Sequence, residues 1–301
     1  MALETTIRPR GPYSLALSAR RAHDATRSFR DGVFIAVLAD GERVSARQLG
    51  DGTIVLRTAT EAGLEQLRFV LGADDDHTPF LRRFRDDGLL AGPIRHLKGL
   101  RPVRTATVTH ALLRAVCSQL ITGREGRLIE GRLIRASTEP VGELQAPPLP
   151  RDLARYAPAE LYRFRLPARK ATALVRICRS FDPERLRSLP PDAAAARLER
   201  ERGIGPYSVG LVWTQGLGRF DRGIVGDLGL LKVCAAIEGR WVDADDTARL
   251  LARYEEWAGL ACVYLMAGAA RGLVPLKLSR AEVRRERVRA RYAEGIACDA
   301  A

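Results

Sequence analysis

The sequence has few cysteines and few histidines, and both shortages exclude classes of metalloprotein. Its five cysteines are an odd number scattered along 301 residues, and no two have the Cys-x-x-Cys spacing of a zinc or redox site. No cluster of cysteines could hold an iron–sulfur centre, and the four histidines lack the spacing of metal ligands. We therefore expect no metal enzyme and no iron–sulfur cofactor. The scattered, odd number of cysteines also indicates free thiols in a reducing compartment and no disulfide framework.

Long apolar segments are also missing. Apolar runs such as residues 33–39 are far shorter than the ~20 residues that a membrane helix needs. Arginines interrupt the amino-terminal stretch at positions 8, 10, 20 and 21, which is too broken a pattern for a signal peptide. We expect a soluble, monomeric, cytoplasmic protein that acts at the nucleoid and has no membrane partner.

Acidic residues are in deficit, and the excess charge is carried by arginine. The chain has 49 basic and 36 acidic residues, a formal net charge of +13, and four of the basic residues are lysines. This balance favours a polyanionic partner, nucleic acid before membrane. A coding bias towards arginine and alanine would give the same balance, so charge alone indicates a class of partner and not a function.

The pattern along the chain predicts an α+β fold. Residues 1–105 form the first domain, a small antiparallel sheet with a helix over 61–71, and Asp40-Gly41 and Asp51-Gly52 are typical hairpin turns. Short runs with strand character follow one another here: 13–18, 33–39, 43–48 and 53–58.

Residues 106–301 are predicted to form a helical domain with two lobes and a cleft between them. Two apolar stripes begin this domain, one including Leu112, Leu113, Val116 and Leu120 and the other including 128–134. Further helical segments follow a Pro-rich joint at 140–150, and an arginine-rich helix is expected over 279–292. The helical segments predicted between the Pro-rich joint and the arginine-rich helix are 151–156, 168–180, 192–202, 207–217, 228–237, 244–257 and 260–271.

The most informative motif is Gly203-Ile204-Gly205-Pro206, which lies between two helical segments. The glycines allow the chain to reverse, Ile204 can fill the gap between the helices, and Pro206 suits the first turn of the second helix. Such a hairpin, 203–210, leaves backbone amides at a helix N-terminus free to bind a phosphate. An ordinary helical turn would have the same glycines.

A carboxylate follows this motif at a loop that precedes another helix. Asp227 comes 22 residues after Gly205 and just before a helix predicted from Leu228. An aspartate here is typical of a helix N-cap, worth ~1 kcal/mol. It could also be a partly desolvated carboxylate directed at an electron-poor centre, and capping would fix its direction.

The hairpin and Asp227 together resemble the helix-hairpin-helix DNA glycosylase superfamily, most closely its 3-methyladenine DNA glycosylase II branch. The resemblance covers most of the chain, because a sheet-containing domain precedes the helices and Gln119-Leu120 stands at the matching place on the entry helix. It implies that Asp227 is the catalytic residue for releasing an alkylated purine, such as 3-methyladenine, from double-stranded DNA that contains damaged bases. The DNA contacts that it implies are Gly203, Ile204, Gly205, Tyr207, Ser208, Val209, Gly210, Gln119 and Leu120.

The same resemblance implies further roles. Leu120 would fill the gap that a flipped nucleotide leaves, although periodicity alone favours a leucine in the core. The base pocket would include Tyr207, Trp213 and Met266, and Na⁺ or K⁺ would bind backbone carbonyls near Glu201 and Ile204. In relatives that cut the strand, a lysine forms a Schiff base two residues after the second hairpin glycine, where this chain has Tyr207. We therefore expect a monofunctional hydrolase of base excision repair.

Departures from the family pattern leave the identity of the base open. Glu201-Arg202 replaces a hydrophobic-Pro pair, and Met266 stands where an aromatic pocket residue is expected. Two alternatives stay open: a non-catalytic DNA-binding protein that keeps the hairpin, and an oxidised-purine glycosylase/lyase.

Overall fold

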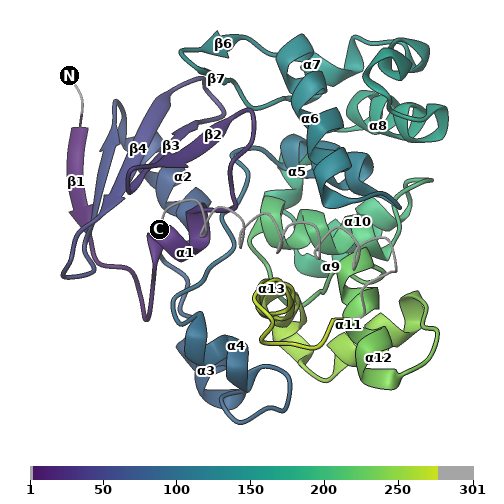
Figure 1. Cartoon of the computed structure of the whole chain (residues 1–301). Helices are drawn as coiled ribbons and strands as arrows, with labels where there is room; N and C mark the ends of the chain where they lie inside the picture. The colour runs from purple at the N-terminus through teal and green to yellow at the C-terminus, as the bar shows by residue number, and fades with distance from the viewer. Residues whose placement is uncertain (1–2, 277–301) are drawn as a thin grey trace, which may run out of the picture.

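A computed structural model describes residues 3–276 of the chain, and it confirms the α+β class. Figure 1 shows a sheet on one side of the molecule and helices on the other. The helix expected over 279–292 lies outside the described residues.

The sheet is antiparallel and has the strand order β1-β5-β4-β3-β2. Three of its strands match runs that the sequence predicted, and the predicted Asp-Gly turns join them: Gly41 and Gly52 both have a φ of 88°. The strands are β1 (Leu3–Ile7), β2 (Arg27–Arg30), β3 (Val33–Val37), β4 (Arg43–Gln48) and β5 (Ile54–Thr58). Helix α2 (Glu61–Leu71) packs against this sheet, as its apolar spacing predicted.

The prediction of a strand over residues 13–18 was wrong. This segment forms helix α1 (Leu15–Ala19), in which the Ser14 side chain accepts a hydrogen bond from the Leu17 amide. Leucine and alanine are strong helix formers, and an N-cap serine satisfies an amide that would otherwise be unpaired. The helix propensity of these residues and the N-cap at Ser14 therefore outweigh the alternating pattern that predicted a strand.

The helical part contains two hydrophobic cores. The first joins five α-helices, the π-helix η3 (Val212–Leu217) and, through one leucine each, three short helices. Its α-helices are α5 (Val108–Ser118), α6 (Gly123–Ser137), α8 (Ala168–Ser180), α9 (Pro191–Glu199) and α10 (Pro206–Leu211). The short helices α7 (Pro150–Ala154), η1 (Pro158–Phe164) and η2 (Pro183–Arg187) and the small ribbon β6 (Pro140–Val141) with β7 (Leu144–Gln145) complete this half of the molecule.

The second helical core does not follow the domain boundary predicted at residue 105. Helices α3 (Thr78–Arg83) and α4 (Ala91–His96) precede that boundary, yet Phe80 and Ile94 pack with the last helices of the described chain. Figure 1 shows α3 and α4 below the sheet, away from its strands. Their partners are α11 (Leu228–Glu238), α12 (Ala244–Ala252), η4 (Glu255–Trp257) and α13 (Ala258–Ala269).

No helix in residues 3–276 is long and apolar enough to cross a membrane.

Candidate functional site

The hairpin between α9 and α10 has the backbone geometry that its glycines predicted. Gly203 has a φ of 96°, in the left-handed region that favours glycine. Ile204 is buried in the first helical core, and Pro206 occupies the first turn of α10. Gly205 caps α10 without a side-chain hydrogen bond. In the described structure, the amides of Tyr207 and Ser208 have no acceptor, so they are available to a phosphate.

The other predicted contact residues of the hairpin contribute to its packing. Ser208 and Val209 are buried, and the Val209 amide already donates to the Gly205 carbonyl at 3.0 Å. A Cβ atom on Gly210 would lie 2.1 Å from the Gly223 carbonyl oxygen. Only a glycine allows this approach, which brings α10 against the loop that leads to Asp227.

Gln119 and Leu120 end helix α5 beside the hairpin. The Gln119 Nε2 atom donates to the Gly203 carbonyl at 2.9 Å and to Ser208 Oγ at 2.8 Å. Lys170 on α8 donates to the Gln119 carbonyl at 2.5 Å, so both the side chain and the backbone of Gln119 are held.

Leu120 is not a core residue, although the apolar stripe of α5 predicted one. Its side chain is 88% exposed, and its φ of 57° is unusual for a leucine. The helix ends at Ser118, and the chain then turns Leu120 out of the stripe. An exposed leucine on a fixed backbone is what insertion into a base stack requires.

Asp227 is the N-cap of α11. Its Oδ1 atom accepts hydrogen bonds from the amides of Gly229 at 2.8 Å and Leu230 at 3.1 Å. Within the described chain Oδ2 has no hydrogen-bond partner, so it is available to a substrate. Burial raises the pKa of the Asp227 carboxyl above its ordinary value, and the two amide hydrogen bonds counteract only part of this shift.

Asp227 lines a cavity of about 980 Å³ at the junction of the sheet domain and the two helical cores. Tyr207, Met266 and Lys232 line the same cavity, as do Gln119, Leu120 and both hairpin glycines. Burial raises the pKa of the Tyr207 hydroxyl, and the nearby charge of Asp227 raises it further, so this phenol stays protonated. The structure therefore brings together most of the residues that the sequence singled out.

Trp213 does not belong to this cavity, so its assignment to the base pocket was wrong. The Trp213 side chain is fully buried, and its Nε1 atom donates to Asp221 Oδ1 at 2.8 Å. It lies on the face of η3 that packs into the first core, whereas Gln215, two residues later, lines the cavity.

The side chain of Glu201 is held by two arginines, at 2.7 Å from Arg197 and 3.4 Å from Arg176. The Na⁺ or K⁺ expected on the carbonyls near Glu201 and Ile204 stays a prediction.

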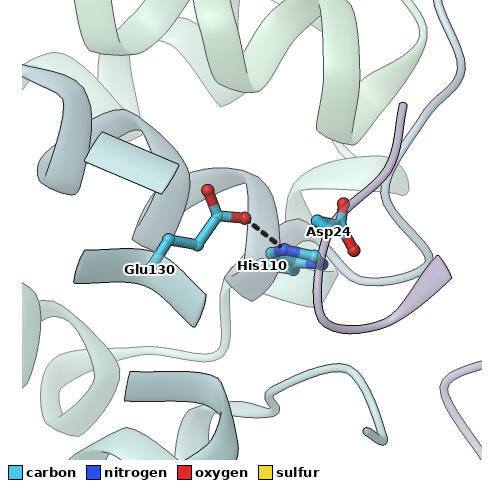
Figure 2. Close-up of side chains that lie close together, drawn as sticks. All are labelled: Asp24, His110 and Glu130. Atoms are coloured by element: carbon cyan, nitrogen blue, oxygen red, sulfur yellow. Dashed lines mark hydrogen bonds and ion pairs between the residues drawn. The ribbon is translucent and has the colours of Figure 1, made fainter. Parts of the chain in front are cut away.

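Sequence analysis missed a buried cluster that we name the Arg114 cluster: Asp24, His110, Arg114 and Glu130. Figure 2 shows Asp24, His110 and Glu130 close together, with Glu130 directed at His110, whose Nε2 atom is 2.7 Å from Glu130 Oε1. The Arg114 guanidinium donates to Glu130 Oε1 at 2.7 Å and to Asp24 Oδ2 at 2.6 Å. Burial alone would raise the pKa of Asp24, but Arg27 and Arg114 hold it well below its ordinary value.

The three ligand-type atoms of Asp24, His110 and Glu130 lie within 4.8 Å of one another, close enough to hold a metal ion. The lone pairs that would bind a cation already face Arg114, which supplies the positive charge. Asp24 precedes the sheet strand β2, whereas the other members lie on α5 and α6, so no spacing in the sequence could have indicated the cluster.

No protein-family model matches the chain. DNA-3-methyladenine glycosylase of Bacillus subtilis (strain 168) is 27% identical over 205 residues, which are 64% of this chain and 67% of that protein.

Two solved structures have a similar fold. One is a 3-methyladenine DNA glycosylase from Archaeoglobus fulgidus, with a TM-score of 0.75, 20% identity, and coverage of 88% of this chain and 97% of that one. The other is an 8-oxoguanine glycosylase/lyase of Clostridium acetobutylicum in complex with double-stranded DNA, with a TM-score of 0.70, 15% identity, and coverage of 91% and 99%. At these identities the likeness establishes the fold alone.

Proposed function

We infer that the chain belongs to the helix-hairpin-helix DNA glycosylase superfamily and is an N-glycosyl hydrolase acting on damaged double-stranded DNA. We propose in addition that its substrates are alkylated purines, such as the 3-methyladenine named for its Bacillus subtilis relative. The observation that carries the proposal is Asp227, a half-buried carboxylate at a helix N-terminus, in a cavity that also includes the hairpin.

The chemistry requires a negative charge beside the sugar. When the bond between C1′ and the purine nitrogen breaks, its electron pair leaves with the base and positive charge develops on the deoxyribose. A carboxylate fixed nearby stabilises that charge, and burial strengthens the effect because little water screens it. Water then attacks C1′ and loses a proton, which Asp227 Oδ2 can accept because its pKa is raised.

The surrounding groups would deliver the nucleotide. A base inside a duplex is unreachable until it is flipped out, at a cost of a few kcal/mol. The free amides of Tyr207 and Ser208 would hold a phosphate, and Leu120 would occupy the gap in the stack. Its burial there returns ~1.5–3 kcal/mol. An alkylated purine already carries positive charge and leaves readily, so a dedicated general acid is not needed.

Tyr207 favours a hydrolase over a lyase. A phenol cannot form the Schiff base that strand cleavage requires, and this position lines the cavity beside Asp227. The likeness to an 8-oxoguanine glycosylase/lyase keeps oxidised purines as a second candidate substrate class.

The test is base release from duplexes that contain either methylated or oxidised purines, measured by chromatography. The wild type should release methylated purines and leave the strand intact. Asp227→Asn should reduce the rate by at least about 10²-fold, since a fixed electrostatic group contributes on that scale. Binding without release of any base would support a non-catalytic DNA-binding protein. A borohydride-trappable adduct would establish a lyase.

A further inference from the structure

One end of the cavity is polar, and nothing in the mechanism above uses it. Arg114, Asp24 and Arg27 line this end together with Gln215 of η3. The Arg114 guanidinium is fixed on several sides, since it also donates to Gln215 Oε1 at 2.8 Å. The Arg114 cluster, of which Figure 2 shows the other three members, therefore serves as a rigid support for the Gln215 side chain.

This contact determines which way the Gln215 amide points. A guanidinium only donates hydrogen bonds, so the atom of Gln215 that faces Arg114 must be the carbonyl oxygen. The NH₂ group is directed elsewhere, and among residues 3–276 it has no acceptor. The backbone is fixed as well, because the Gln215 carbonyl accepts from the Thr105 amide at 2.8 Å.

Gln215, which has the free NH₂ group, lies on the same helix face as Tyr207. Tyr207, Leu211 and Gln215 all line the cavity and recur every four residues. Helical side chains lean towards the N-terminus, which directs the Gln215 amide back along the helix towards Leu211. Tyr207 lines this cavity together with Asp227 and Arg114, so the same surface includes the carboxylate and the polar end.

We propose that Gln215 Nε2 is a specificity-determining donor that binds a carbonyl oxygen on the edge of the flipped purine. A sugar placed at Asp227 directs its base along the Tyr207 face towards this amide. Guanine-derived bases present O6, an acceptor, whereas adenine-derived bases present an amino donor at the same position. The inference rests on the proposed function, and it predicts that guanine-derived alkylpurines are favoured over adenine-derived ones.

A single methylated DNA tests this, because it contains both 7-methylguanine and 3-methyladenine. The quantity measured is the ratio of their enzymatic release rates, each corrected for enzyme-free loss, and this ratio does not depend on the fraction of folded enzyme. Gln215→Glu keeps the oxygen that faces Arg114 and replaces the donor with an acceptor. We expect the ratio to shift towards 3-methyladenine by about tenfold or more, since a lost hydrogen bond leaves two acceptors opposed.

Two further variants make the outcome decisive. Gln215→Met removes the donor without adding a charge, so it should lower 7-methylguanine release and leave 3-methyladenine release nearly unchanged. Gln119→Glu is the matched control, because this glutamine bonds to the hairpin and not to a base; it should slow both releases and leave their ratio unchanged.

An unchanged ratio in both Gln215 variants would overturn the role of Gln215 while leaving the proposed function intact, and equal loss of both bases would do the same. Failure of the wild type to release either base would overturn the proposed function itself.

Discussion

At the scale of single residues, Asp227 has two roles that oppose each other. As an N-cap it stabilises α11 by accepting two amide hydrogen bonds. As a half-buried carboxylate it costs solvation energy, which is why its pKa is raised. A group whose pKa is higher in the folded state binds protons more tightly there, so its ionisation destabilises the fold as the pH rises through that pKa.

Removing this charge should therefore lower the activity without lowering the stability of the fold. We expect Asp227→Asn to lose base release and yet to unfold at the same or a higher temperature at pH 7, because asparagine keeps the cap without the buried charge. In the wild type, release of a base that does not itself titrate should decline on acidification below a pKa higher than the ~4 of an ordinary aspartate. Calorimetry and a pH–rate profile measure the two effects. A lower melting temperature for the variant would show that the carboxylate stabilises the fold.

The candidate site could be predicted from sequence only where a residue type by itself indicates a particular backbone conformation or cap. The glycines at 203 and 205 and an aspartate before a helix indicate a hairpin and a cap in any context. Trp213 carries no such information, because an aromatic ring suits a core and a pocket equally. Gln215 was missed because its significance comes from Arg114, about a hundred residues away in the chain.

At the scale of secondary-structure elements, the end of α5 is held by two neighbouring elements. Its last residues contact the hairpin through Gln119 and α8 through Lys170, and this keeps Leu120 exposed in a left-handed conformation.

The helices and strands themselves were largely predictable from the sequence. α2 and α8 match their predicted ranges, since Thr60 and Gly72 cap α2 and apolar periodicity defines α8. β2 was missed because Arg27–Arg30 has no apolar alternation.

Leu120→Ala should slow base release from a fully paired duplex by about tenfold, since the side chain no longer fills the gap in the stack. Release from single-stranded DNA should change little, because no gap forms there. Leu128→Ala is the matched control: Leu128 on α6 is 53% exposed and lies outside the cavity lining. Lys170→Met should give a weaker form of the Leu120 defect. Equal loss on paired and single-stranded DNA would contradict a role in base flipping.

At the scale of the whole molecule, the Arg114 cluster joins the sheet domain to the helices. Asp24 lies beside β2, and it binds both Arg27 of that strand and Arg114 of α5. The predicted boundary at residue 105 followed the change from strand-like to helical patterning along the chain, and this pattern could not show that α3 and α4 pack into the second helical core.

Asp24→Ala should lower the free energy of unfolding by about 3–5 kcal/mol, since it leaves two buried guanidinium groups without their shared partner. Chemical denaturation measures this, with Asp86→Ala as the control, because the Asp86 ion pair with Arg85 is exposed. The pKa of Asp24 is lowered in the fold, so its contribution is present above the ordinary aspartate pKa and declines as the pH falls. The difference between wild type and variant should therefore shrink in acid; a difference independent of pH would contradict the ion-pair explanation.

Because the cavity lies at the junction of three cores, its hairpin and its polar end should form at different stages of folding. The hairpin is local: Glu201 to Val209 can form when α9 and α10 meet. The polar end requires residues 21–27, Arg114 and Gln215 to come together from distant parts of the chain. If the proposed function holds, the phosphate-binding hairpin should therefore form during folding before the part of the cavity that distinguishes one base from another. On that proposal, a partly folded molecule would bind the DNA backbone without base preference, and the preference would require the complete fold.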